Sequence, residues 1–141
     1  MYPNLTGLNV LFLDDQLTTV TFGVDHLVKR LGGTVRICSS VDDAIACTLA
    51  QPESHRFHAV VVDYQVEGIR PGTDFAVWLW EHSDPAYTSI RRICYSGRQE
   101  SQIRTALPDE NVLNAIISKG SLDALSSLFN ELGQACADIQ H

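Results

Sequence analysis

The sequence lacks the features that mark membrane, secreted and nucleic-acid-binding proteins. No apolar run approaches the roughly 20 residues of a membrane-spanning helix, and residues 1–10 do not show the charged and then apolar segments of a signal peptide. Only 10 Lys and Arg residues stand against 17 Asp and Glu, for a formal net charge of -7. Phosphate-rich partners need clustered positive charge. We therefore expect no nucleic-acid partner and no membrane partner.

The sequence has four cysteines, and no two of them form a CxxC pair. The spacing of Cys38, Cys47, Cys94 and Cys136 matches neither a zinc site nor a disulfide framework. We interpret all four as reduced thiols that fill core space, which favours a cytoplasmic protein. The sequence also has no GxGxxG or P-loop glycine pattern, so nucleotide binding is not expected.

What is present is an ordinary globular composition, with 45% hydrophobic residues in a chain of 141. This length predicts one domain over residues 1–141, with no room for an output domain. Apolar runs that read as strands alternate with segments of helical periodicity. The expected strands are 9–13, 34–38, 58–64, 89–96 and 112–118, and the expected helices are 17–31, 39–51, 75–82, 99–107 and 121–139.

Alternating strands and helices predict an α/β fold, a five-stranded parallel sheet with helices on both faces, as in flavodoxin-like doubly wound (βα)5 proteins. The alternation of apolar and polar residues in 34–38 predicts a strand near an edge of the sheet. The continuous apolar run in 58–64 predicts a strand that is covered on both faces. Two helices are expected to begin at side-chain caps, Ser39 or Ser40 for the second and Thr73 or Asp74 for the third.

Two helical faces can be predicted from spacing alone. Trp78 and Trp80 are two residues apart and cannot share a face, so one is expected in the core and the other as an exposed contact residue. The last helix is expected to bury one face, made of Leu122, Leu125, Leu128, Phe129 and Leu132.

Polar side chains follow four of the five expected strands. The first strand runs into Asp14 and Asp15, the third into Asp63, the fourth into Ser96 and the fifth into Lys119. The carboxyl ends of parallel strands lie at one edge of a sheet, where such folds bind ligands. These five side chains are therefore expected to meet.

The expected chemistry follows from this grouping. Three carboxylates cannot stay ionised close together unless a cation joins them, and Mg²⁺ prefers one or two carboxylates with waters and phosphate oxygens. Such a pocket, with a lysine and a hydroxyl, can hold a phosphoryl group in line with a carboxylate nucleophile. The product would be an aspartyl phosphate.

The segments "VLFLDDQ", "AVVVDY", "ICYSG" and "ISKG" carry this set in order. Together they resemble the receiver domain of response regulators in two-component signalling, over about residues 8 to 136. The resemblance implies that Asp63 accepts the phosphoryl group. It implies a Mg²⁺ site in which Asp15 and Asp63 bind the metal directly, Asp14 binds through water and Gln65 contributes its backbone carbonyl.

The same resemblance implies that Ser96 is the hydroxyl that turns toward the phosphoryl group. Lys119 would pair with a phosphoryl oxygen, and Gly97 would leave the site accessible. The implied partners are a histidine kinase or a histidine phosphotransfer protein as donor, and a downstream protein target. The domain would catalyse only its own phosphoryl transfer and dephosphorylation, so it is not expected to be an enzyme in the usual sense.

The sequence departs from the family pattern at three places. Gly120 follows the lysine where the family usually has proline, and Ile116 replaces an aromatic residue that usually swings with the hydroxyl. Tyr95 is a weak substitute for that aromatic residue, and its ring is expected to pack in the core or rim. The loop 63–72 is about one residue longer than usual, so Arg70 is expected to reach back over the site.

Two other functions remain open at this stage. A pseudo-receiver would bind partners without taking phosphate, and the residues at 116 and 120 keep that possibility open. A magnesium-dependent phosphatase with an aspartate nucleophile would place a second Asp two residues after it, where this chain has Gln65.

Overall fold

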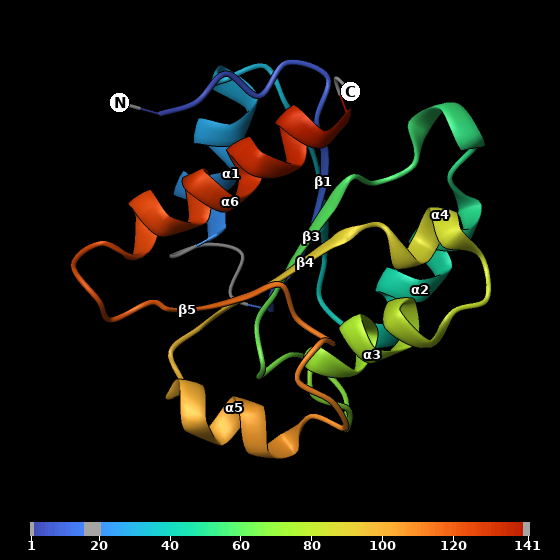
Figure 1. Cartoon of the computed structure of the whole chain (residues 1–141), viewed down its shortest axis with the longest axis vertical. Helices are drawn as coiled ribbons and strands as arrows, with labels where there is room; N and C mark the ends of the chain where they lie inside the picture. The colour runs from blue at the N-terminus through green and yellow to red at the C-terminus, as the bar shows by residue number, and fades with distance from the viewer. Residues whose placement is uncertain (1, 16–20, 140–141) are drawn as a thin grey trace.

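The computed structural model describes residues 2–15 and 21–139, so the predicted helical positions Leu17 and Val20 lie outside the described residues. Five parallel strands form one sheet in the order β2-β1-β3-β4-β5 (Figure 1). The strands are β1 (Asn9–Leu13), β2 (Thr34–Cys38), β3 (Ala59–Val62), β4 (Arg91–Ser96) and β5 (Ala115–Ser118). The helices are α1 (Thr21–Arg30), α2 (Val41–Ala50), the 3-10 helix η1 (Glu53–His55), α3 (Thr73–Glu81), α4 (Pro85–Thr88), α5 (Glu100–Ala106) and α6 (Ala124–Ile139).

This arrangement confirms the predicted doubly wound fold. Helices α1 and α6 cover one face of the sheet, and α2 and α3 cover the other (Figure 1). The alternating strand β2 lies at an edge, and the apolar strand β3 lies at the centre with all four residues buried, as predicted. No helix in the described part of the chain is long and apolar enough to cross a membrane.

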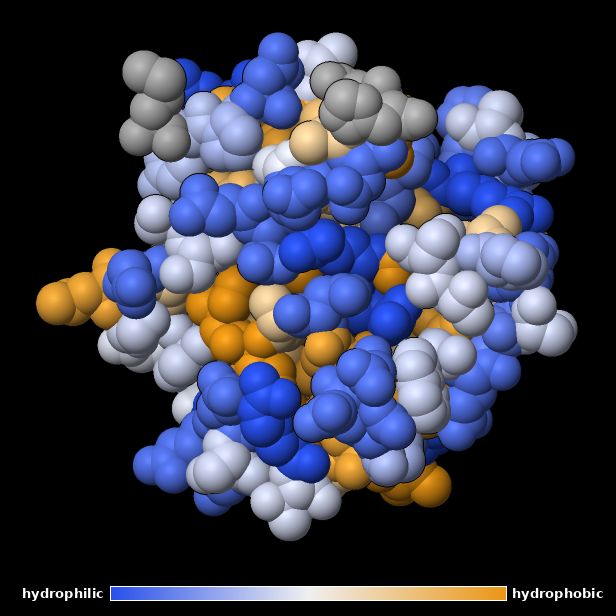
Figure 2. All heavy atoms as spheres, viewed as in Figure 1, coloured by the Kyte–Doolittle hydropathy of each residue, from blue (hydrophilic) through white to orange (hydrophobic). Residues whose placement is uncertain are grey.

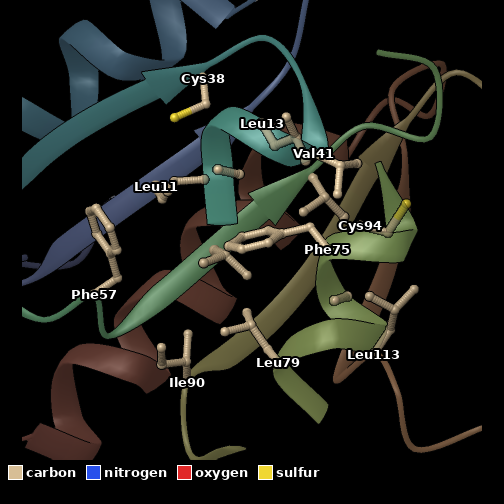
Figure 3. Close-up of a cluster of buried hydrophobic side chains, with 14 of the residues drawn as sticks. Leu11, Leu13, Cys38, Val41, Phe57, Phe75, Leu79, Ile90, Cys94 and Leu113 are labelled. Atoms are coloured by element: carbon tan, nitrogen blue, oxygen red, sulfur yellow. The ribbon is translucent and has the colours of Figure 1, made fainter. Parts of the chain in front are cut away.

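Two hydrophobic cores lie on opposite faces of the sheet because successive strand residues point to opposite sides. We call the cluster under α2 and α3 the α2/α3 core; Leu11 and Leu13 of β1 enter it beside Phe75 (Figure 3). We call the other the α1/α6 core; Val10 and Phe12 of β1 enter it beside Phe129. The four cysteines are free thiols, as expected, and burial with the charge of Asp63 raises the pKa of Cys94 to about 12.

The helix starts show one correct cap and one wrong cap. Ser40 caps α2, and its hydroxyl oxygen accepts a hydrogen bond from the Asp43 N–H at 3.2 Å. The prediction of a Thr73 or Asp74 cap for α3 is wrong, because α3 begins after Gly72, which has no side chain to accept a hydrogen bond. Thr73 is instead buried in the first turn.

Two surface predictions are also corrected. Leu122 is fully exposed because α6 begins only at Ala124, so it does not join the buried face of that helix. Trp78 and Trp80 are both partly buried against the α2/α3 core, so neither is a fully buried or a fully exposed residue. The short helix α4, which the sequence did not predict, places Tyr87 beside Trp78 with ring centroids 6.0 Å apart.

Strand β5 is the other edge of the sheet and is only partly covered. It pairs with β4 alone, and its Ala115 and Ile116 are partly buried. Hydrophobic surface is visible between α6 and α5 in the space-filling view, in a surround that is mostly hydrophilic (Figure 2).

Candidate functional site

The carboxyl edge of the sheet brings the predicted polar residues together. Asp14, Asp63 and Lys119 are each positioned by a backbone hydrogen bond that extends a strand ladder by one residue. The Asp63 N–H donates to the Leu13 carbonyl at 2.9 Å, and the Lys119 N–H donates to the Ser96 carbonyl at 2.9 Å. The Asp14 N–H donates to the carbonyl of Cys38 at 3.0 Å. The side chains therefore start from a rigid frame rather than from free loops.

A cavity of about 670 Å³ opens at this edge. Asp15, which lies just after β1, is exposed, whereas Asp63 and Ser96 are only 8% and 1% exposed. The residues that line the cavity are Asp15, Asp63, Gln65, Ser96, Gly97, Arg98, Gln99, Gln102 and Lys119. All the site residues predicted from the sequence line it except Asp14.

Lys119 explains how the fold tolerates carboxylates at this edge. Its Nζ donates to Asp63 Oδ2 at 2.9 Å and to Asp14 Oδ2 at 3.1 Å. The lysine side chain is only 15% exposed, and those of Asp14 and Asp63 are 7% and 10% exposed. Two carboxylates at such distances would repel each other strongly in a poorly solvated site, and one ammonium group offsets that repulsion for both.

The pKa of Lys119 reflects this balance. Burial by itself lowers the pKa of the ammonium group, but the hydrogen bonds and charges of Asp63 and Asp14 outweigh burial and raise the pKa above its ordinary value of 10.5. The ammonium also lies 5.6 Å from the centre of the Tyr95 ring. Burial raises the pKa of Tyr95, and the charge of Lys119 partly opposes this rise. Lys119 is therefore a firmly held cation.

The acids do not form a single three-carboxylate cluster. In residues 2–15 and 21–139, no group of three or more His, Cys, Asp or Glu side chains is arranged to hold a metal ion. Asp14 is turned toward Lys119, whereas Asp15 and Asp63 face the cavity together with Gln65. Two carboxylates and one carbonyl oxygen still match the few protein ligands that Mg²⁺ takes beside its waters.

Ser96 lies at the cavity, and the residues near it that are unusual for a receiver domain pack in the two cores or follow Lys119. Ser96 Oγ accepts a hydrogen bond from the Arg98 N–H at 3.2 Å, at the wall of the cavity. Ile116 packs against the α2/α3 core, and Tyr95 packs against the α1/α6 core as expected. The described residues contain no cis peptide bond, so Gly120 follows Lys119 through a trans bond.

One sequence prediction about the site is wrong, and three cavity residues were missed. Arg70 does not reach over the site, because its guanidinium pairs with Asp42 at 3.5 Å and with Asp74 at 3.3 Å. The missed residues are Arg98, Gln99 and Gln102, which follow β4 and begin α5. For Arg98 and Gln99, the position directly after the "YSG" segment was the only available signal, since a loop has no periodicity to read; Gln102 lies on α5, and its sequence gives no sign that it faces the cavity.

Known proteins match this chain in structure but not in sequence. No family model matches the sequence, and no curated protein matches it. Solved structures do match. A sensor protein from Polaromonas sp. JS666 is 13% identical, with a TM-score of 0.75 over 94% of this chain and 98% of that chain. A response regulator receiver domain protein from Clostridium thermocellum is 15% identical, with a TM-score of 0.73 over 94% of this chain and 97% of that chain.

A third match concerns the metal. The receiver domain of a sensor histidine kinase from Pseudomonas aeruginosa has magnesium coordinated in its active-site cleft. It is 14% identical to this chain, with a TM-score of 0.71 over 94% of this chain and 99% of that chain. At these identities the likeness establishes a shared fold, the one found in receiver domains.

Proposed function

We propose that the chain is a phosphoacceptor receiver domain of two-component or phosphorelay signalling, phosphorylated on Asp63. The observation that carries the proposal is the ammonium of Lys119 between Asp63 and Asp14, at the wall of a cavity that also holds Asp15 and Ser96. A purely structural ion pair would need neither the open cavity nor the second acid. The fold supports the proposal because the matched structures include receiver domains.

The proposed reaction is a phosphoryl transfer to Asp63. A carboxylate oxygen of Asp63 attacks the phosphorus of a phosphohistidine or an acyl phosphate. The bond from phosphorus to the donor nitrogen or oxygen breaks, and the donor leaves with the electron pair. Lys119 donates a hydrogen bond to the Asp63 carboxylate before the transfer and can bind a phosphoryl oxygen after it. Ser96, already at the cavity wall, can donate its hydroxyl proton in a hydrogen bond to another phosphoryl oxygen.

A Mg²⁺ ion fits the donors that face the cavity. The carboxylates of Asp15 and Asp63 and the backbone carbonyl of Gln65 would hold it, with Asp14 acting through water. When bound, Mg²⁺ would neutralise negative charge on the acid cluster and on the incoming phosphoryl group. The chain's own contribution is the rigid placement of these oxygens by β1 and β3, which pair in register from Val10 to Leu13.

The proposed partners follow from the proposed chemistry. A histidine kinase or a histidine phosphotransfer protein would supply the phosphoryl group, and the phosphorylated domain would change its binding to a downstream protein or pass the phosphate onward. We propose no catalysis beyond the domain's own phosphorylation and dephosphorylation. A phosphatase of the aspartate-nucleophile type is disfavoured because the residue two after Asp63 is Gln65, whose amide cannot act as a general acid.

Incubation with acetyl phosphate and Mg²⁺ tests the proposal. We expect intact-protein mass spectrometry to show one added phosphoryl group, absent in Asp63→Asn and present in the matched control Asp42→Asn, whose exposed acid lies outside the cavity. Removal of Mg²⁺ with a chelator should abolish labelling. A folded wild-type protein that takes no phosphoryl group would instead support the pseudo-receiver, and steady hydrolysis of simple phosphate esters would support the phosphatase.

A further inference from the structure

Two residues beside the site form a pair that the proposed reaction does not yet use. Arg98 lies two residues after Ser96, and Tyr64 directly follows Asp63. The guanidinium carbon of Arg98 lies 4.8 Å from the centre of the Tyr64 ring, which is within the range of a cation–π contact. Each member of the pair thus lies within two residues of a side chain that the phosphoryl group would touch.

The two partners differ in how firmly they are held. The Tyr64 side chain is partly buried against the α2/α3 core, and its carbonyl accepts a hydrogen bond from the Gly72 N–H at 2.8 Å. Arg98 is exposed, and among the described residues its side chain forms no ion pair. Its backbone is tied to the site, because its N–H donates to Ser96 Oγ. The arginine head group is therefore the part that can move.

Phosphorylation changes the charge that this cavity must accommodate. The Asp63 carboxylate carries one negative charge, and an aspartyl phosphate carries about two near pH 7. Lys119 is already shared between Asp63 and Asp14. Arg98 is the other cationic side chain among the described residues that line the cavity. Hydrogen bonds from a guanidinium to phosphoryl oxygens are stronger than the cation–π contact of an exposed arginine.

We propose that Arg98 leaves the Tyr64 ring and binds the phosphoryl group when Asp63 is phosphorylated. This inference rests on the proposed phosphoacceptor function and names a regulatory element of the same site. The freed face of Tyr64 then becomes available, so the pair acts as a two-position switch at the mouth of the cavity. The released Tyr64 ring would be an aromatic contact that changes with phosphorylation. Residue 116 cannot provide one, because it is an isoleucine that packs against the α2/α3 core.

Beryllofluoride with Mg²⁺, a probe that mimics the bound phosphoryl group, tests the switch by titration calorimetry. We expect Arg98→Met to weaken beryllofluoride binding about tenfold, because the variant keeps the length of the side chain and loses its charge. Tyr64→Leu should tighten binding about two- to fivefold, since Arg98 no longer has to leave a ring. The double variant should bind like Arg98→Met alone. Tyr64→Phe keeps the ring and should bind like wild type.

Arg104→Met is the matched control for loss of one positive charge on this side of the molecule. Arg104 is exposed on α5, pairs with Glu100 at 2.7 Å and does not line the cavity, so its loss should leave binding unchanged. In wild type, the NMR signals of the Tyr64 ring should shift when beryllofluoride binds, and this shift should be lost in Arg98→Met.

The outcomes separate the two proposals. If wild type binds beryllofluoride and Arg98→Met binds it within twofold as tightly, the switch is refuted while the phosphoacceptor function stands. The switch is also refuted if Arg104→Met weakens binding as much as Arg98→Met, because the effect would then be general charge. If wild type binds no beryllofluoride, the phosphoacceptor function fails and the switch fails with it.

Discussion

Gly72 shows how a residue that has no side chain can shape the site. A Cβ atom placed on Gly72 would overlap the backbone carbonyl oxygen of Asp63, and backbone cannot move aside as a flexible side chain can. The φ angle of Gly72 is -58°, which any residue can adopt, so the requirement here is space and not backbone conformation. The close approach brings the start of α3 directly against the proposed phosphoacceptor.

Replacing this glycine tests the steric argument. Gly72→Ala should lower the free energy of unfolding by about 1–3 kcal/mol, the usual range for overpacking, as measured by urea denaturation. Gly23→Ala is the matched control, because Gly23 lies within α1 and a Cβ there would meet nothing within 4 Å. That variant should gain up to about 1 kcal/mol from helix propensity. Equal stability of Gly72→Ala and wild type would contradict the predicted overlap.

At the residue scale, the sequence predicted the polar residues at strand ends, but it missed Arg98 and misplaced Arg70, which lie in loops. Asp63, Ser96 and Lys119 could be found because a buried strand stops at each of them, and parallel strands end at one edge. The sequence could not show which of Arg70 and Arg98 reaches the site, since each lies in a loop whose course depends on tertiary contacts. Arg70 is drawn to acids on α2 and α3, whereas Arg98 turns to the ring beside Asp63.

Among the elements, β4 contains an unusual buried arginine. Arg92 is 6% exposed, and its guanidinium donates hydrogen bonds to backbone carbonyls; it forms no ion pair with a carboxylate of residues 2–15 or 21–139. The acceptors lie in two connections, before β4 and before β5: Thr88 at 2.7 Å, Ile90 at 2.8 Å, Val112 at 2.6 Å and Asn111 at 3.4 Å. One side chain thus supplies donors to both connections that lead into the last two strands.

Loss of these donors should be costly. Arg92→Met should lower the free energy of unfolding by about 2–4 kcal/mol, because buried carbonyls lose their partners. The neighbouring Arg91→Met is a matched control, since Arg91 is partly exposed and pairs with Glu131 at 2.7 Å. Its loss should cost at most about 1 kcal/mol, as for an exposed ion pair. Denaturant unfolding of both variants decides the matter, and similar costs would refute a special role for Arg92.

Element types were predictable, and element ends were less so. Each of the five strands was expected at its position; the clearest signals were the apolar runs of β1 and β3 and the alternation of β2. The one-turn helix α4 was missed because four residues are too few to show a helical period. The start of α3 was misplaced by one or two residues, because the tight packing of Gly72 on Asp63 decides where that helix begins.

At the scale of the whole molecule, a basic group at each end of the sheet has a shifted pKa, and the two shifts have opposite directions. The carboxyl end holds the acids around Lys119, whose ammonium is stabilised by them. At the amino end, His58 Nδ1 accepts a hydrogen bond from the Asn9 N–H at 2.9 Å, and burial lowers the pKa of His58 below its ordinary value of 6.5. A protonated ring would carry a hydrogen on Nδ1 and would lose this acceptor.

This difference predicts acid sensitivity at the amino end. Because the folded-state pKa of His58 is lowered, its contribution to stability is complete above pH 6.5 and is lost as the pH falls through the folded-state pKa. Wild type should therefore lose more unfolding free energy between about pH 7.5 and about pH 5 than His58→Asn, which keeps an acceptor and does not titrate. His26→Asn, on the exposed side of α1, is the control. Parallel pH profiles for wild type and His58→Asn would contradict the prediction.

The bridge made by Lys119 has a mechanical consequence. The lysine backbone follows β5, an edge of the sheet, while its ammonium binds acids that follow β1 and β3 near the centre. We expect a change of charge on Asp63 to shift Lys119, and with it the end of β5, directly. No rearrangement of β4, which lies between β3 and β5, is needed. The segment after Lys119, which carries the fully exposed Leu122, is then the first part of the surface to move when the charge on Asp63 changes.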